Sequence, residues 1–209
     1  MLFRSEVDLV ADLKDSIHDA ANVFTGANDE DFSRMLDAAA LDIGRVRPRT
    51  MLGTLTLVAD QDAYAAPADL LTYKSDLWSV QARRYQTWDA NYPGRLPDIR
   101  TALNGSTREL HFLPAPTSAQ ITVLGAAFKY YYFAGHAIGA AAADTTVQPG
   151  DRGLLILRAQ AEAMKEMAVR NSGKPVSMRD GISNMSRNGT PSYLYEMLMK
   201  DFERIGGLA

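Results

Sequence analysis

Two short strand patterns in the middle of the chain, each leading to a proline, constrain the fold most. Residues 54–57 alternate threonine with leucine, and residues 109–112 alternate a charged or polar side chain with a large apolar one. This period of two is typical of strands with one buried face. Pro67 follows the first pattern and Pro114 the second, and proline pushes the residue before it out of the helical region. The sequence therefore predicts an antiparallel β-element whose strands continue into extended segments.

Apolar residues at spacings of three and four predict helices on both sides of this element. The expected helices cover residues 6–24, 29–46 and 151–170. The first two are joined by a short connection, which implies an antiparallel helix hairpin. The sequence thus predicts an α+β protein. Its mainly helical core is formed by the hairpin and the long third helix, with a β-rich insertion over about residues 50–134.

The C-terminal part of the chain differs in composition from this core. We expect residues 1–170 to form the core and residues 171–209 to form a flexible C-terminal arm. Glycine, serine, asparagine and proline dominate residues 171–190, which is typical of linkers, and a last helix is expected over residues 191–205. A helix of this length is marginal in water, so we expect it to be loosely placed until it meets a partner. The alternative is that it folds back onto the core.

The arm is the predicted partner-binding segment, because it combines basic side chains with an apolar helix face. The basic residues precede the helix, and the apolar and aromatic residues lie on it. These candidate site residues are Lys174, Arg179, Arg187, Leu194, Tyr195, Leu198, Phe202 and Ile205.

The overall charge and the absence of cysteine argue against several classes of function. The chain carries 22 Lys and Arg against 25 Asp and Glu, a net charge of −3, whereas nucleic-acid-binding proteins usually carry a basic excess or stripe. A chain without cysteine has no disulfide, zinc–thiolate site or cysteine nucleophile. The longest weakly polar stretch, residues 130–143, is shorter than the ~20 apolar residues that span a bilayer. We therefore expect no membrane partner.

Motifs of catalytic and cofactor-binding sites are missing from the sequence. It contains no Walker loop, no Gly-x-Gly-x-x-Gly and no Gly-x-Ser-x-Gly, and its three histidines lack the spacing of metal ligands. We therefore expect no catalytic residue, no cofactor and no metal. His136 is best interpreted as a structural hydrogen-bonding residue. The alternative is a small-molecule enzyme that uses His136 with a carboxylate such as Asp144 or Asp151.

The aromatic run over residues 128–133 predicts a strand with two different faces. Alternation sends Tyr131 and Phe133 to the face opposite the other two tyrosines. We interpret this strand as buried on both faces or at a subunit contact. The candidate contact residues are Trp78, Tyr131 and Phe133. The alternative is a nucleic-acid-binding module in which Arg83, Arg84 and the tyrosines act together, but basic residues are sparse around the run.

Four segments of the chain carry a resemblance to a known family. They are the N-terminal helix hairpin, residues 55–70 ahead of Trp78, residues 110–116 leading to residues 130–136, and residues 145–151 at the entry to the alanine-rich third helix. In this order and at this spacing they resemble the head–tail adaptor proteins of tailed bacteriophages, also called connector or head-completion proteins. The resemblance covers roughly residues 5–170.

This resemblance implies a structural virion protein rather than an enzyme. It implies a helical core with an inserted β-element, assembled as a ring of about twelve subunits that links the DNA-filled capsid to the tail. The implied partners are other copies of the chain, the portal protein above the ring, and the next tail or neck component. Packaged DNA passes through the ring without sequence-specific contacts. The resemblance also implies a C-terminal segment that reaches the portal, and a place in the virion neck after assembly in the cytoplasm of a bacterial host.

Overall fold

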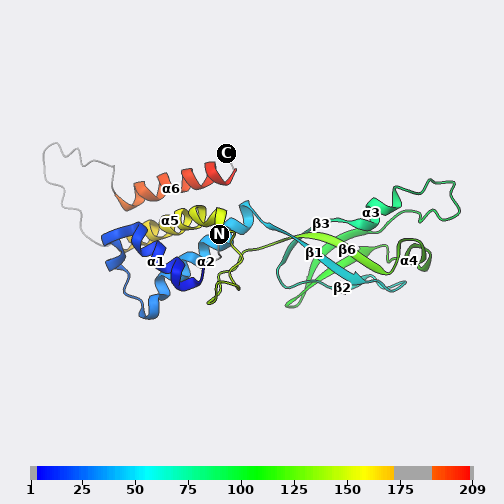
Figure 1. The fold of residues 1–209 in the computed structure, drawn as a ribbon, viewed down its shortest axis with the longest axis horizontal. Helices are drawn as coiled ribbons and strands as arrows, with labels where there is room; N and C mark the ends of the chain where they lie inside the picture. Colours follow the sequence, from blue (N-terminus) through cyan, green and yellow to red (C-terminus); the bar gives the residue numbers. More distant parts are fainter. Residues whose placement is uncertain (1–3, 172–189, 208–209) are drawn as a thin grey trace. The chain divides into compact units, whose positions relative to one another are not determined.

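A computed structural model describes residues 4–171 and 190–207 of the 209-residue chain. The chain divides into two compact units (Figure 1). The helical unit comprises Met1–Arg47 and His136–Ala209, and the β unit comprises Pro48–Gly135. The β unit is therefore inserted between two helices of the other unit, and each unit has its own buried core.

Four α-helices and three 3₁₀ turns make up the described part of the helical unit. The helices are α1 (Glu6–Ile17), α2 (Glu30–Val46), α5 (Arg152–Asn171) and α6 (Pro191–Gly206), and the turns are η1 (His18–Val23), η2 (Ala27–Asp29) and η3 (Pro149–Asp151). The last three helices begin and end within one residue of the ranges expected from sequence. The first expected helix, residues 6–24, is α-helical only as far as Ile17. His18 has a φ of 50°, which interrupts the α-helix because this region is sterically unfavourable for residues other than glycine.

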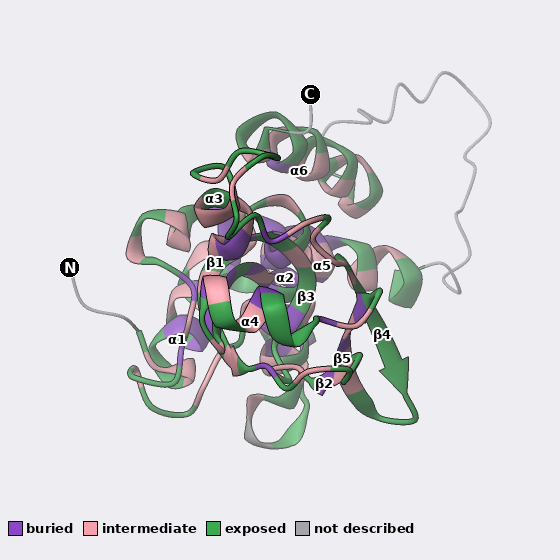
Figure 2. Ribbon diagram, turned by 90° about the vertical axis from the view of Figure 1, so that its right-hand side faces the viewer, coloured by how far each residue is buried: buried purple, intermediate pink, exposed green. Residues whose placement is uncertain are grey.

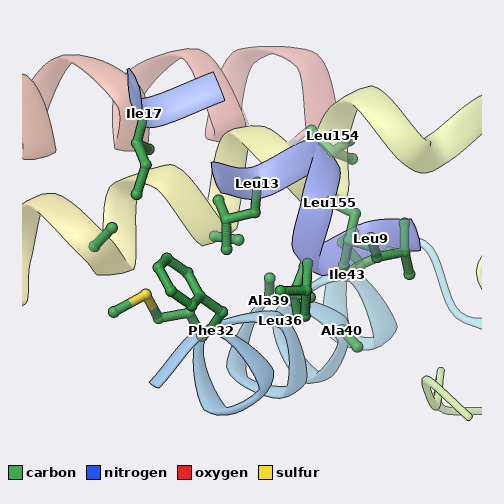
Figure 3. Close-up of a cluster of buried hydrophobic side chains, with 14 of the residues drawn as sticks. Leu9, Leu13, Ile17, Phe32, Leu36, Ala39, Ala40, Ile43, Leu154 and Leu155 are labelled. Atoms are coloured by element: carbon green, nitrogen blue, oxygen red, sulfur yellow. The ribbon is translucent and has the colours of Figure 1, made fainter. Parts of the chain in front are cut away.

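Helices α1, α2 and α5 bury their apolar faces against one another (Figure 3). Leu13, Leu36, Ile43 and Leu155 are inaccessible to solvent. Burial of this kind contributes roughly 25 cal/mol for each Å² of apolar surface removed from water. The contact among these three helices therefore stabilises the helical unit, and α6 adds Phe202 to the same core.

A buried arginine ties α5 to α2. Arg158 Nε donates to Asp42 Oδ2 at 2.8 Å, and its Nη1 donates to Glu162 Oε2 at 3.0 Å. Both acids have a second cationic partner, Arg45 and Lys165 respectively. Burial acts to raise the pKa of Glu162, but the hydrogen bonds from Lys165 and Arg158 outweigh it and hold this pKa below its usual value. The charge of Arg158 is thus compensated within the unit.

Two three-stranded antiparallel sheets make up the β unit. The strands are β1 (Arg49–Thr56), β2 (Ala63–Ala65), β3 (Leu70–Asp76), β4 (Asp98–Asn104), β5 (Thr107–Leu113) and β6 (Ala127–Ala134), and the short helices are α3 (Leu77–Ala82) and α4 (Ser118–Leu124). The sheet orders are β1-β6-β3 and β2-β5-β4. The sheets bury a shared core that is rich in aromatic rings. Phe112 of β5 meets Phe128 of β6 edge to face, with ring centroids 5.1 Å apart.

The predicted fold class is wrong in its account of the β part. A mainly helical core with one inserted β-element does not describe a chain with two three-stranded sheets and a separate β core. The strands that sequence reasoning misses lack a clear alternation. Strand β3 contains two register shifts, after Leu70 and after Tyr73, and β4 is exposed along almost its whole length (Figure 2). A period of two is visible only where one face of a strand is buried without interruption.

Gly53 of β1 makes room for a buried tyrosine. It pairs with Tyr130 of β6, and a Cβ atom at position 53 would lie 2.4 Å from Tyr130 Cζ and 2.6 Å from its hydroxyl oxygen. The Tyr130 ring is held in place by the rings of Tyr73 and Phe128, which stack on it. The absence of a side chain at position 53 therefore allows the ring to lie over β1.

We expect Gly53→Ala to destabilise the β unit by about 1–3 kcal/mol, because the added methyl group and the buried Tyr130 ring compete for one space. Gly135→Ala is the matched control in the same unit, since its Cβ would meet only Leu71 Cδ1, at 3.8 Å. Both tryptophans of the chain lie in the β unit, so urea unfolding followed by tryptophan fluorescence measures the change. Equal stability of the two variants would show that the ring moves aside freely.

Candidate interaction surfaces

The central strand β6 divides its side chains between the core and the open face of its sheet. Buried side chains alternate along it with exposed or half-buried ones, which confirms the predicted alternation. The buried set is Phe128, Tyr130 and Tyr132, and the outward set is Lys129, Tyr131 and Phe133. Two of the candidate contact residues, Tyr131 and Phe133, thus lie on one face, which is open in the single chain.

Side chains from the two neighbouring strands complete this open face. Leu52 of β1 pairs with Tyr131, and the two residues are 54% and 37% exposed. Lys74 of β3 places its Nζ 4.8 Å from the centre of the Phe133 ring and 3.3 Å from Thr50 Oγ1. We call Leu52, Lys74, Lys129, Tyr131 and Phe133 the outer sheet face. Antiparallel sheets commonly turn polar side chains to water, so aromatic and aliphatic groups in this position favour contact with another molecule.

Sequence reasoning finds Tyr131 and Phe133 but misses Leu52 and Lys74. Leu52 precedes the recognised pattern of residues 54–57, and extending the same alternation backwards along β1 would have placed it on this face. Lys74 lies at a register shift of β3. Its contact with Phe133 depends on the pairing of strands far apart in the sequence, for which no local signal exists.

Trp78, the third candidate contact residue, lies in the core of the β unit. Its side chain is only 2% exposed, and its ring meets Phe128 edge to face with centroids 5.5 Å apart. Asp76 caps α3 by accepting a hydrogen bond from the Ser79 backbone N–H, so Trp78 lies in the first turn of this helix. The structure therefore does not bring Trp78 to the surface that carries Tyr131.

The terminal helix α6 packs on the helical unit. Phe202 is buried in the core of this unit, and Tyr195 and Leu198 pack partly against it. At the other end of α6, Arg47 Nη2 donates to Ile205 O at 2.6 Å. The sequence predicts a loosely placed helix because a helix of this length is marginal in water by itself. Most helix stability in proteins comes from the packing of an amphipathic face, and α6 packs such a face on its own unit.

Part of the predicted docking face on α6 remains open. Leu194 and Ile205 are exposed, and so is Met197, which sequence reasoning does not single out. The candidates that lie outside the described residues are Lys174, Arg179 and Arg187. Most of the linker-like stretch 171–190 lies outside them as well. Helix α6 therefore has one face on its own unit and further apolar side chains that the described chain leaves partly exposed.

No family model and no curated protein matches the sequence. None of the helices in the described part of the chain combines the length and apolarity that crossing a membrane requires. Among the same residues, no group of three or more His, Cys, Asp or Glu is placed to hold a metal ion.

His136 has a structural environment within the helical unit. Its Nε2 lies 2.9 Å from Arg47 O and its Nδ1 lies 3.2 Å from Thr146 O, so both ring nitrogens face main-chain carbonyls. Asp151 is paired with Arg47 at 2.6 Å. Among the described residues, no hydrogen bond joins His136 to Asp144 or Asp151. The pair that the enzyme alternative names is therefore not assembled in this structure.

We expect Phe202→Ala to lower the free energy of unfolding of the helical unit by about 3 kcal/mol, because it opens a cavity under α6. Leu194→Ala, on the same helix but exposed, is the matched control and should change stability by less than about 0.5 kcal/mol. Urea unfolding followed by circular dichroism at the helix band measures both. If the two changes lowered the free energy of unfolding by similar amounts, α6 would not be packed on α5.

A designed disulfide between α2 and α6 tests directly whether α6 packs on its own unit. A Cβ at position 206 lies 3.8 Å from Val46 Cβ, and this separation is close to the mean of about 3.8 Å in disulfides. The natural chain has no cysteine, so Val46→Cys with Gly206→Cys should form a single cross-link within one chain. If this cross-link did not form under oxidising conditions, the packing of α6 against the end of α2 would be contradicted.

His136→Ala should lower the free energy of unfolding of the helical unit by about 1–2 kcal/mol, because the ring can no longer donate a hydrogen bond to the carbonyl of Arg47 or of Thr146. Thermal and urea unfolding followed by circular dichroism measure the change. Loss of a measurable turnover with an unchanged free energy of unfolding would instead support the enzyme alternative.

Proposed function

We propose that the chain is a structural protein of a bacteriophage virion, a head–tail adaptor whose copies form a ring under the portal. The outer sheet face carries this proposal, because it exposes the Leu52–Tyr131 pair next to Phe133. Exposed groups of this kind mark contacts with other proteins. The resemblance of four sequence segments to head–tail adaptors supports the kind of assembly in which this contact is made.

The helical unit offers a counter-surface for the outer sheet face. Subunits of a ring meet through unlike surfaces. Residues 1–47 carry ten Asp and Glu against five Lys and Arg, and a groove of about 430 Å³ between α1 and α2 is lined by Glu6, Val7 and Ser33 among others. Desolvation, followed by the charge of Glu6, raises the pKa of nearby Asp37. The groove combines the apolar side chains of Val7 and Val10 with the carboxylate of Glu6, and Lys14 in its wall is paired with Asp29. This combination complements Tyr131 and the two lysines of the outer sheet face on the next copy.

Helix α6 is the proposed contact with the portal protein. It keeps Phe202 in its own core while Leu194, Met197 and Ile205 remain exposed. An amphipathic helix with apolar side chains left over suits a groove on another protein. The next tail or neck component, and the DNA that passes through the ring, complete the proposed partners. In this proposal the chain acts without catalysis in the neck of the virion, after assembly in the cytoplasm of a bacterial host.

Ring formation on the portal protein of the same phage tests the proposal. We expect the double variant Leu52→Ala/Tyr131→Ala to fold normally and to lower the fraction of protein in rings about tenfold, because paired apolar side chains at the centre of a contact carry much of its energy. Leu103→Ala is the matched control, an exposed leucine on β4 of the other sheet. Size-exclusion chromatography with mass measurement and electron micrographs quantify the rings.

Two results would contradict different parts of the proposal. Normal ring formation by the double variant would remove the outer sheet face from the subunit contact. Purified virions that lack the protein would contradict the adaptor function itself. A monomer in the absence of portal protein contradicts neither part, because the portal can template the closure of the ring.

A further inference from the structure

The loop over residues 83–97 joins α3 to β4 in the β unit (Figure 1) and carries Trp88. We call it the Trp88 loop. Trp88 is 81% exposed, and Tyr92 in the same loop is 41% exposed. A tryptophan this open to water is unusual for a side chain with so much apolar surface. The ring is therefore available to another molecule.

The Trp88 loop is folded, although it contains no helix or strand. Tyr85 and Leu96 pack against the β core on either side of its tip. At the tip, the Asp89 side chain accepts a hydrogen bond from the Gln86 N–H at 2.6 Å, and the Asp89 N–H donates to Gln86 O at 2.9 Å. These bonds hold Trp88, which lies between the two residues, in a defined turn. Because the main chain of this turn is already fixed, binding orders mainly the Trp88 side chain, which limits the conformational entropy lost.

The Trp88 loop carries an excess of positive charge. The loop carries three arginines, Arg83, Arg84 and Arg95, against one acid, Asp89, and all three arginines are exposed. Among the described arginines, ten are paired with an acid. Of the four that have no acidic partner in the described chain, three lie in this loop. The loop is thus a local basic site on a protein with a net charge of −3.

We infer that the Trp88 loop binds a nucleic acid with accessible bases. Trp88 stacks on a base, and the guanidinium groups of Arg83, Arg84 and Arg95 contact phosphates, which is how sequence-tolerant single-strand binding works. The combination favours nucleic acid over an acidic protein, because the planar ring and the planar guanidinium groups match a base and its phosphates together. Tyr130 and the other buried tyrosine of β6 take no part, because they lie in the core. The inference does not depend on the adaptor function.

Fluorescence anisotropy of the full chain with a labelled oligothymidine of about 20 nucleotides tests the inference. A blunt duplex of equal length and poly-glutamate serve as comparison ligands. We expect the oligothymidine to bind at low salt, more tightly than the duplex and the polypeptide. Because Trp88 is exposed and Trp78 is buried, the oligothymidine should also reduce the tryptophan fluorescence of the natural chain but not that of Trp88→Phe.

Substitutions in the loop separate stacking from charge. Trp88→Ala should weaken oligothymidine binding about tenfold. The double variant Arg83→Ala/Arg84→Ala should lower the slope of log affinity against log salt by about 1.4, since each phosphate contact on a single strand contributes about 0.7. Arg204→Ala, an exposed arginine on α6, is the matched control and should change neither quantity.

Three results would overturn the inference. One is the absence of oligothymidine binding at low salt, and a second is unchanged binding by Trp88→Ala. The third is binding of poly-glutamate at least as tight as that of the oligothymidine, which would assign the loop to an acidic protein partner. All of these measurements use the isolated chain, so they are independent of whether it forms rings on a portal.

Discussion

The packing of β6 between β1 and β3 is the constraint on which the β unit depends. Phe128 of this strand meets Phe112 of the second sheet and Trp78 of α3, so a single strand joins both sheets and a helix. Side chains alternate along a strand, and burial of this set leaves Tyr131 and Phe133 outside the core. Tyr131 and Phe133 are therefore turned outward because their neighbours on β6 fill the core. A partner that covers these two rings binds a surface that results from the packing of the β unit.

The helices are predictable because their signals are local. The apolar stripes of α2 and α5 lie within single segments, and the structure shows both helices close to the expected ranges. The early end of α1 is not predictable, because nothing in the sequence indicates the positive φ of His18. The two sheets are not predictable either. Their strand order is set by contacts far apart in the sequence, and the register shifts in β3 disrupt the alternation.

The candidate surfaces, too, are predictable only as far as they depend on neighbouring residues in the sequence. Alternation alone places Tyr131 on an outward face, whereas its pairing with Leu52 depends on the register of β1 against β6. An aromatic side chain by itself does not reveal its environment. Trp78 and Trp88 are ten positions apart and have opposite surroundings: the first turn of α3 holds Trp78 in the core, and a turn closed by Asp89 leaves Trp88 in water.

The β unit is attached to the rest of the chain through two neighbouring strands. Arg49 at the start of β1 pairs with Ala134 at the end of β6, and Arg49 Nε donates to Gly135 O at 2.9 Å. The two ends of the inserted segment are therefore side by side, the geometry in which a domain insertion is tolerated. In evolutionary terms, recombination can gain, lose or exchange the whole β unit as one block, because a short turn between Arg47 and His136 would close the gap.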